Sequence, residues 1–226
     1  MDCKGVVFDL DHTLFDRYAT MKAIGQSFYL AFQNNITPGL TQSQAINLWC
    51  EADQKKVHLG WDHVLAYGEQ SGLFLKAPSL EKYRAFLLPA FCQIAIPFPF
   101  TNPTLSLLRS RGYQIGLITN GSSPVQRAKL TLLALQPYFD EILIPSELGM
   151  QKPDPEPFWE MSRRLSIQPE NLIYVGDNPI NDIQAARNAG YQPVWVKTTG
   201  EWVPQIRRAQ WEIDTIAQLP QLLSAI

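Results

Sequence analysis

The stretch KGVVFDLDHTLFD, residues 4–16, joins a strongly apolar run to two closely spaced carboxylates. The run at 6–8 is apolar on both alternating sets of positions, which predicts a strand buried on both faces of a sheet. Asp9 and Asp11 follow this run and are separated by a single residue. Carboxylates held together at the end of a core strand repel each other, so we expect a cation to compensate them.

The composition indicates a globular protein with a substantial core, and it excludes several classes of partner. Of the 226 residues, 46% are hydrophobic and 18% are charged. A formal net charge of −2 gives no polycationic face, so we expect no nucleic acid and no membrane as a partner. No apolar run approaches the roughly 20 residues that a membrane span requires. The first strand begins almost at once, so we expect no targeting segment and a cytoplasmic location.

Four further apolar runs resemble the first and predict additional buried strands, at 113–119, 141–145, 171–177 and 191–197. Helical patterns lie between these runs, and Asp154 is expected to cap one of these helices ahead of Pro155. The alternation of strand and helix is typical of a parallel sheet wound by right-handed crossovers. We therefore predict an α/β fold, a three-layer Rossmann-like core with a mainly parallel sheet.

Residues 17–95 interrupt this alternation, because they carry helical patterns with no strand pattern between them. We predict an inserted α-helical cap domain over this range. The core domain is then discontinuous and consists of 1–16 and 96–226. The proline-rich segment IPFPFTNP, at 96–103, is interpreted as the linker that returns the chain to the core.

Polar side chains end the predicted strands, at the edge where open parallel sheets bind their ligands. Asp9, Asp11 and Asp177 would form a hard oxygen site of the kind that Mg²⁺ prefers. The Thr119 hydroxyl and the backbone amides after it suit a phosphate at a helix N-terminus, and Lys152 adds a point charge. Such a set describes metal-assisted phosphoryl transfer through an aspartyl-phosphate. The candidate site residues are Asp9, Asp11, Thr119, Asn120, Gly121, Lys152, Asp177 and Asp182.

Four motifs that occur in a fixed order make the chain resemble the haloacid dehalogenase superfamily, in its phosphatase-type branch with a helical cap. DLDHT at 9–13 is similar to the DxDxT motif of that family, and TNG at 119–121 to its hydroxyl-bearing second motif. QKPDP at 151–155 is similar to the lysine motif, and GDNPIND at 176–182 to the GDxxxxD motif. The resemblance implies a HAD-like phosphoric monoester hydrolase acting on a small phosphorylated metabolite.

The resemblance also implies a role for each matching residue in the chemistry. Asp9 would be the nucleophile that attacks phosphorus. Asp11 would be the general acid that protonates the leaving oxygen, and later the base that activates water. Thr119 and Lys152 would hold the transferring phosphoryl group. The dehalogenase branch has no acid/base aspartate at the position of Asp11, so this residue favours phosphate over halide.

The same resemblance implies the ligands of a Mg²⁺ cofactor. These would be an oxygen of Asp9, the backbone carbonyl of Asp11, and Asp177. Asp182 would lie nearby or reach the metal through water, although it also suits a carboxylate in the first turn of a helix. His12 is interpreted as non-catalytic, because strand alternation would point it away from the aspartates.

Alternatives to a phosphatase stay open at this stage. A phosphomutase on the same scaffold would return the phosphoryl group to its substrate and would use the same residues. A non-catalytic phosphoacceptor or binding module would also combine aspartates, a hydroxyl and a lysine, although such receiver domains are shorter and lack a helical insertion. The sequence leaves the specific phosphate ester and the oligomeric state undetermined.

Overall fold

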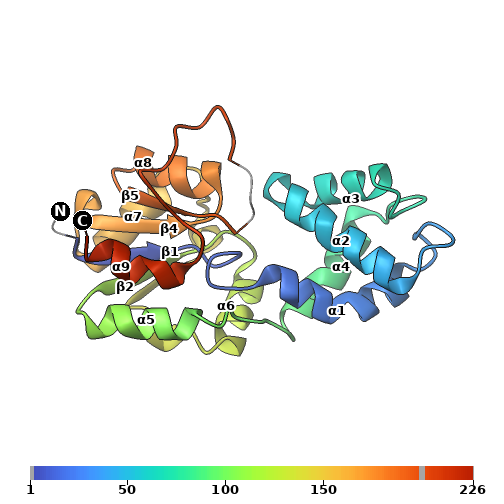
Figure 1. Cartoon of the computed structure of the whole chain (residues 1–226), viewed down its shortest axis with the longest axis horizontal. Helices are drawn as coiled ribbons and strands as arrows, with labels where there is room; N and C mark the ends of the chain where they lie inside the picture. Colours follow the sequence, from blue (N-terminus) through green and yellow to red (C-terminus); the bar gives the residue numbers. More distant parts are fainter. Residues whose placement is uncertain (1–2, 199–201, 226) are drawn as a thin grey trace. The chain divides into compact units, whose positions relative to one another are not determined.

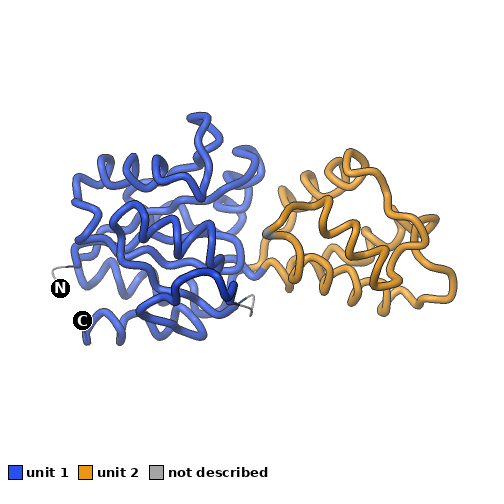
Figure 2. Tube along the Cα trace, turned by 90° about the horizontal axis from the view of Figure 1, so that it is seen from above, with its two compact units in different colours: residues 1–16, 97–226 blue, residues 17–96 orange. Residues whose placement is uncertain are grey.

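The computed structural model describes residues 3–198 and 202–225 of the chain. The chain divides into two compact units, which Figure 2 distinguishes by colour. The core unit consists of Met1–Asp16 and Pro97–Ile226, and the helical unit consists of Arg17–Ile96.

The described residues of the core unit form a six-stranded sheet in the order β3-β2-β1-β4-β5-β6, with every neighbouring pair parallel. This confirms the predicted fold class of an α/β core with a mainly parallel sheet. Each of the five predicted strands is present, and a short sixth strand was not predicted. The strands are β1 Gly5–Phe8, β2 Gln114–Ile118, β3 Glu141–Leu143, β4 Leu172–Gly176, β5 Gln192–Val196 and β6 Trp211–Ile213.

The first strand lies at the centre of the sheet, which explains why its residues are apolar on both faces. All of β1 is buried, and Phe8 is in register with Leu117 on one side and Val175 on the other. From β1 the chain builds outward through β2 to β3, and then returns to β4 on the opposite side of β1. Such a reversal of strand order opens a crevice at the carboxyl ends of the central strands, where ligands bind.

Helices cover both faces of this sheet (Figure 1). On one face, α7 and α8 pack through a buried apolar cluster that includes Val7, Tyr174, Phe158 and Ala186. On the other face, α5 lies beside α9. The helices of the core unit are α5 Thr101–Ser110, α6 Ser123–Leu132, α7 Glu156–Leu165, α8 Ala185–Asn188 and α9 Leu219–Leu223.

Two local expectations for the core unit were wrong. Thr101–Ser110 is helical, so the last three residues of the predicted linker at 96–103 belong to the first turn of α5. Asp154 does not cap α7, because Pro155 occupies the N-cap position with backbone angles that are already helical (φ −75°, ψ −19°). Asp154 lies instead in a turn, where its backbone N–H donates to the carbonyl of Gln151 at 3.0 Å.

The helical unit contains α1 Arg17–Phe32, α2 Gln42–Lys56, α3 Trp61–Gln70 and α4 Leu80–Phe91. Its interior is aromatic: the rings of Phe28 and Trp49 stack with centroids 3.9 Å apart, and the Trp49 indole N–H donates to the Tyr83 hydroxyl at 2.7 Å. Arg17 makes a two-point ion pair with Asp53, at 2.7 and 2.9 Å, and both side chains are buried. Because each charge is paired, the interior tolerates them at a small net cost.

Membrane association by a spanning helix finds no support in the part of the chain that the structure describes. None of the helices there combines the length and the apolar character that a bilayer crossing demands.

Candidate active site

The backbone of the first motif leaves the sheet directly after Asp9. The Asp9 N–H donates to the carbonyl of Val175 at 2.9 Å, which extends the pairing of β1 with β4 by one residue. A tight turn follows, in which the carbonyl of Leu10 accepts from Leu14 at 2.9 Å. His12 has a φ of 64°, in the left-handed region, so the alternation that we used to orient its side chain does not extend to it.

Lys152 lies at the centre of the buried polar cluster. Its Nζ is 2.7 Å from Asp9 Oδ1 and 2.7 Å from Asp182 Oδ1. It also donates to the Tyr174 hydroxyl at 2.9 Å and to the carbonyl of Ile118 at 3.2 Å. Only 2% of the lysine side chain is exposed. The two carboxylates offset the cost of burying this charge, and the contacts fix the ammonium beside the predicted nucleophile.

Three carboxylates gather at the ends of β1 and β4. One oxygen from each of Asp9, Asp177 and Asp182 lies within 4.8 Å of the others, and all three residues are buried. Carboxylate oxygens that share so small a volume repel one another, and a hard divalent cation relieves that repulsion. The residues at this position therefore fit a Mg²⁺ ion. The Asp11 carboxylate is not part of this cluster.

Burial changes the protonation of the central pair. It raises the pKa of Asp9 to about 7 from the usual 3.8; Lys152 opposes this rise, whereas the charge of Asp182 adds to it. Burial lowers the pKa of Lys152, but the carboxylates of Asp182 and Asp9 outweigh that effect and hold it well above its usual value. The lysine is thus charged, and a further cation near Asp9 would favour the carboxylate form that a nucleophile requires.

The loop after β4 holds Asp182 in place. The backbone N–H of Asn178 donates to Asp182 Oδ2 at 2.9 Å. The Asn178 side chain accepts from the N–H groups of Ile180 and Asn181, so it caps the helical turn that carries Asp182. A Cβ at Gly176 would lie 2.5 Å from the Asp182 Cγ, closer than two carbon atoms can approach. Glycine at this position is therefore required by the aspartate that packs against it.

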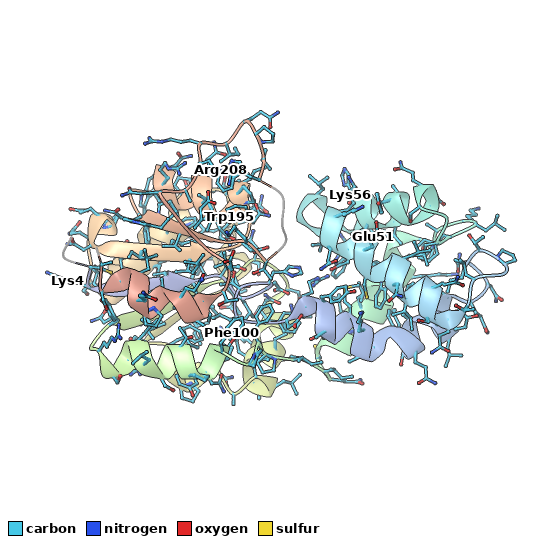
Figure 3. All side chains as sticks on the ribbon, in the orientation of Figure 1. Lys4, Glu51, Lys56, Phe100, Trp195 and Arg208 are labelled. Carbon is cyan, nitrogen blue, oxygen red and sulfur yellow. The ribbon has the colours of Figure 1, made fainter. Side chains whose placement is uncertain are left out.

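Asp177 is positioned through its backbone by a residue that we did not predict. The indole N–H of Trp195, on β5, donates to the Asp177 carbonyl at 2.8 Å. The Trp195 ring packs edge-on against Trp202, with centroids 4.8 Å apart, and the Arg208 guanidinium lies 5.6 Å from its centroid (Figure 3). These contacts hold the loop that begins at Asp177 against the neighbouring strand.

The segment after β2 places a hydroxyl and a tight turn beside the lysine. The Thr119 N–H donates to the Leu143 carbonyl at 3.1 Å, so this residue still follows the sheet. The Asn120 side chain binds the backbone of Lys152 at both ends, donating to its carbonyl at 2.8 Å and accepting from its N–H at 3.0 Å. Gly121 has a φ of 128°, which glycine alone adopts readily. The Asn120 side chain thus holds the loop that carries Lys152. Only the backbone groups of Asn120 remain available to bind a substrate.

Asp11 is held from α6 by two residues that the sequence analysis missed. Lys129 Nζ lies 2.7 Å from Asp11 Oδ1, and Gln126 Nε2 lies 2.9 Å from Asp11 Oδ2. The same Gln126 nitrogen is 2.5 Å from Thr119 Oγ1. Gln126 and Lys129 are three residues apart on the helix that follows the second motif, and that spacing was the available signal.

Sequence comparison relates the chain to a family of hydrolases. The sequence pattern of the haloacid dehalogenase-like hydrolases matches residues 6–196. A protein of Methanopyrus kandleri, named glyceraldehyde 3-phosphate phosphatase, is 32% identical over 202 residues, which are 86% of this chain and 84% of that protein. A protein of the same name from Methanothermobacter thermautotrophicus is 30% identical over 235 residues, covering 97% of this chain and 99% of that protein.

Structural comparison leads to the same relationship. The crystal structure of a HAD phosphatase from Thermococcus onnurineus aligns with a TM-score of 0.65 and 26% sequence identity, and the alignment covers 97% of each chain. The resemblance drawn from the four motifs is confirmed. The chain belongs to the haloacid dehalogenase-like hydrolase family.

Proposed function

We propose that the protein is a Mg²⁺-dependent phosphatase that hydrolyses a small phosphorylated metabolite through an aspartyl-phosphate on Asp9. The observation that carries this proposal is the contact of Lys152 with Asp9 at 2.7 Å, next to the cluster with Asp177 and Asp182. A buried carboxylate beside a fixed cation is prepared to meet a phosphate and to share its charge. The phosphatase names of the two relatives support a phosphate monoester as the substrate.

Substrate binding would use groups from three loops. Lys152 and the Thr119 hydroxyl would hold oxygens of the phosphate, together with the backbone N–H groups of 120–121, just before the N-terminus of α6. Asp9 is the carboxylate that would attack phosphorus, and Lys152 binds its Oδ1. The lysine keeps the attacking carboxylate and the phosphoryl group in one fixed geometry.

The chemistry would proceed in two displacements at phosphorus. In the first, Asp9 forms a bond to phosphorus, the bond to the ester oxygen breaks, and Asp11 gives its proton to the leaving alkoxide. In the second, Asp11 takes a proton from water, whose oxygen attacks phosphorus, and Asp9 is released with inorganic phosphate as the product. Halide would leave without a proton, so an acid at Asp11 is useful for a phosphate ester and unnecessary for a dehalogenase.

Magnesium would be held by oxygens of Asp9 and Asp177, with the backbone carbonyl of Asp11 as a further ligand. It would supply positive charge that offsets the repulsion between the phosphate and the carboxylates. Both Asp182 oxygens already accept hydrogen bonds, from Lys152 and from the Asn178 N–H, so this residue would act on the metal through water.

The helical unit, Arg17–Ile96, is proposed as the cap that selects the substrate. Caps of this kind exclude water from a phosphoryl-transfer site and contact the part of the substrate that does not react. The core unit contributes the groups that recognise phosphate, so the identity of the ester would depend on residues of the helical unit.

The test is the release of inorganic phosphate from a panel of small phosphate monoesters, with Mg²⁺ and with a chelator. The proposal expects metal-dependent release that Asp9→Asn abolishes. Asp214→Asn is the matched control, because it makes the same substitution at a carboxylate whose side chain is 68% exposed and paired with Lys197. Phosphate release that persists in Asp9→Asn would contradict the assignment of Asp9 as the nucleophile. Conversion of a sugar phosphate into its isomer without release would indicate a phosphomutase.

A further inference from the structure

The two oxygens of the Asp11 carboxylate are each bound by a different side chain of α6. Lys129 donates to Oδ1 at 2.7 Å and Gln126 to Oδ2 at 2.9 Å. Both donors are 2% exposed, whereas the Asp11 side chain is 25% exposed and so is reachable from solvent. A lysine is rarely buried to this extent, and here its ammonium is aimed at a carboxylate next to the proposed reaction.

Gln126 connects Asp11 to the phosphate-binding segment. Its Nε2 carries two hydrogens, and it lies within hydrogen-bond distance of both Asp11 Oδ2 and Thr119 Oγ1. A Cβ at Gly121 would lie 3.3 Å from the Gln126 side chain, so the glycine of the second motif also leaves room for this residue. One amide therefore fixes the separation between the carboxylate and the hydroxyl expected to hold the phosphoryl group.

We propose that Lys129 and Gln126 are positioning residues that orient the Asp11 carboxyl for proton transfer to the leaving oxygen. This inference rests on the proposed phosphatase function. Neither residue would touch the substrate. A carboxyl that is free to rotate would spend much of its time out of reach of the ester oxygen, and proton transfer requires hydrogen-bond distance. By binding both oxygens from one rigid helix, the pair holds the carboxyl in one orientation. Oδ1 faces the Lys129 ammonium, so the transferred proton would be carried by Oδ2, whose second lone pair is left open by Gln126.

A purely structural role is the competing explanation for Lys129. Its ammonium lies 4.7 Å from the centroid of Phe15, so it also packs against the turn that follows Asp11. Loss of that packing would lower stability and would affect every substrate alike. A positioning role predicts a different result, because only the esters whose leaving group needs a proton depend on the orientation of Asp11.

The experiment compares an alkyl phosphate with p-nitrophenyl phosphate in the Mg²⁺-loaded full chain. The alkoxide of the first must be protonated as it leaves, whereas p-nitrophenolate departs as a stable anion. The measured quantity is kcat/KM, which covers the steps up to departure of the leaving group and excludes the later hydrolysis of the aspartyl-phosphate. Lys129→Met is expected to lower kcat/KM for the alkyl ester by about tenfold or more and to leave the aryl ester much less affected.

Matched variants separate positioning from folding. Lys129→Arg should restore part of the alkyl-ester rate, because it keeps the cation. Gln126→Met should lower the rates of both esters, because its contact with Thr119 is lost, and should lower that of the alkyl ester more strongly. This greater loss for the alkyl ester tests the inference independently if Lys129→Met does not fold. Arg127→Met is the control on the same helix: it removes a cation that pairs with Glu147 at 2.8 Å, and it should change neither rate.

The outcomes distinguish this inference from the proposed function. Equal losses for both esters, or no loss for the alkyl ester, overturn the positioning role while the phosphatase function stands. Absence of turnover by the unmodified protein on every ester overturns the proposed function and the inference together.

Discussion

The ammonium of Lys152 lies 2.7 Å from Oδ1 of Asp9, a residue 143 positions earlier in the chain. The contact crosses from the loop after β3 to the end of β1, and the topology of the sheet makes it possible. Because β3, β2, β1 and β4 are neighbouring parallel strands, the loops that follow them open at the same edge of the sheet, and their polar residues converge on Asp9.

Replacing Lys152 tests how much its contact with Asp9 contributes to stability and to catalysis. Lys152→Met leaves Asp9 and Asp182 buried without their shared cation, so we expect a loss of about 3–5 kcal/mol in the free energy of unfolding. We also expect phosphate release to fall at least about a hundredfold, because the charge that holds the phosphoryl group is lost. Urea unfolding and the phosphate assay measure the two effects. Tyr174→Phe is the milder comparison, since it removes one hydroxyl from Lys152 and keeps the charge; equal effects of the two variants would contradict the account.

The pKa of Asp9 predicts how the stability of the metal-free protein depends on pH. Burial raises this pKa to about 7 from the usual 3.8, against the opposing effect of Lys152. Because the folded value is the higher one, the folded state keeps a proton that the unfolded chain releases. The stabilising contribution is complete below the usual value and is lost as the pH rises through the folded value.

The pH dependence of the Asp9 contribution can be tested by comparing the unmodified protein with Asp9→Asn in the presence of chelator. As the pH rises through the folded pKa, Asp9→Asn should gain stability relative to the unmodified protein, because only the unmodified protein loses the stabilising contribution of the Asp9 proton. The difference should shrink as the pH falls toward the usual value of an aspartate. Denaturant titrations across this range provide the measurement, with the exposed substitution Asp214→Asn as the control. A difference independent of pH would show that Asp9 does not titrate as described.

Removal of one carboxylate should weaken metal binding measurably. For Asp177→Asn we expect the Mg²⁺ concentration that gives half of the thermal stabilisation to rise by about 10- to 100-fold. The readout is the melting temperature as a function of Mg²⁺, which does not depend on catalysis. The control is Asp154→Asn, because Asp154 is exposed and lies in a turn outside the cluster. Unchanged affinity in Asp177→Asn would exclude this carboxylate as a ligand.

The packing of Asp182 against Gly176 can be tested by a substitution that changes no charged group. A methyl group at Gly176 would lie 2.5 Å from the Asp182 Cγ, so Gly176→Ala must displace the aspartate. We expect a loss of about 1–3 kcal/mol in stability from overpacking, together with weaker Mg²⁺ binding. Thermal unfolding with and without metal checks both. Wild-type stability with wild-type metal affinity would mean that this packing does not position Asp182.

Most of the sheet was predictable from the sequence, because its strands are buried on both faces and read as continuous apolar runs. The run around Val6 is the clearest example. β6, Trp211–Ile213, escaped prediction because it is three residues long and only its last residue is buried. The start of α3, Trp61–Gln70, also carries no clear sequence signal, because the helix follows a glycine without a side-chain cap. Both elements are stabilised mainly by tertiary packing, which leaves only a weak signal in the local sequence.

The residues of the four motifs could be predicted because each follows a strand, whereas their supporting contacts could not. Lys129 is 118 positions from Asp11, and a helical lysine of this kind is normally interpreted as part of a solvated face. Trp195 resembles any other buried aromatic residue in a strand until its indole is found beside the Asp177 carbonyl. Such contacts depend on how the elements pack. The spacing of Gln126 and Lys129 places them on one face of a helix but does not indicate which carboxylate that face contacts.

The most direct test of the central claim is detection of phosphate on Asp9 during turnover. The Mg²⁺-loaded protein would be quenched in acid while it hydrolyses its best ester, and the digested peptides would be analysed by mass spectrometry. The account predicts a phosphorylated peptide that contains Asp9, sensitive to hydroxylamine and missing from Asp9→Asn. Steady turnover in which phosphate is found on another residue would contradict Asp9 as the nucleophile.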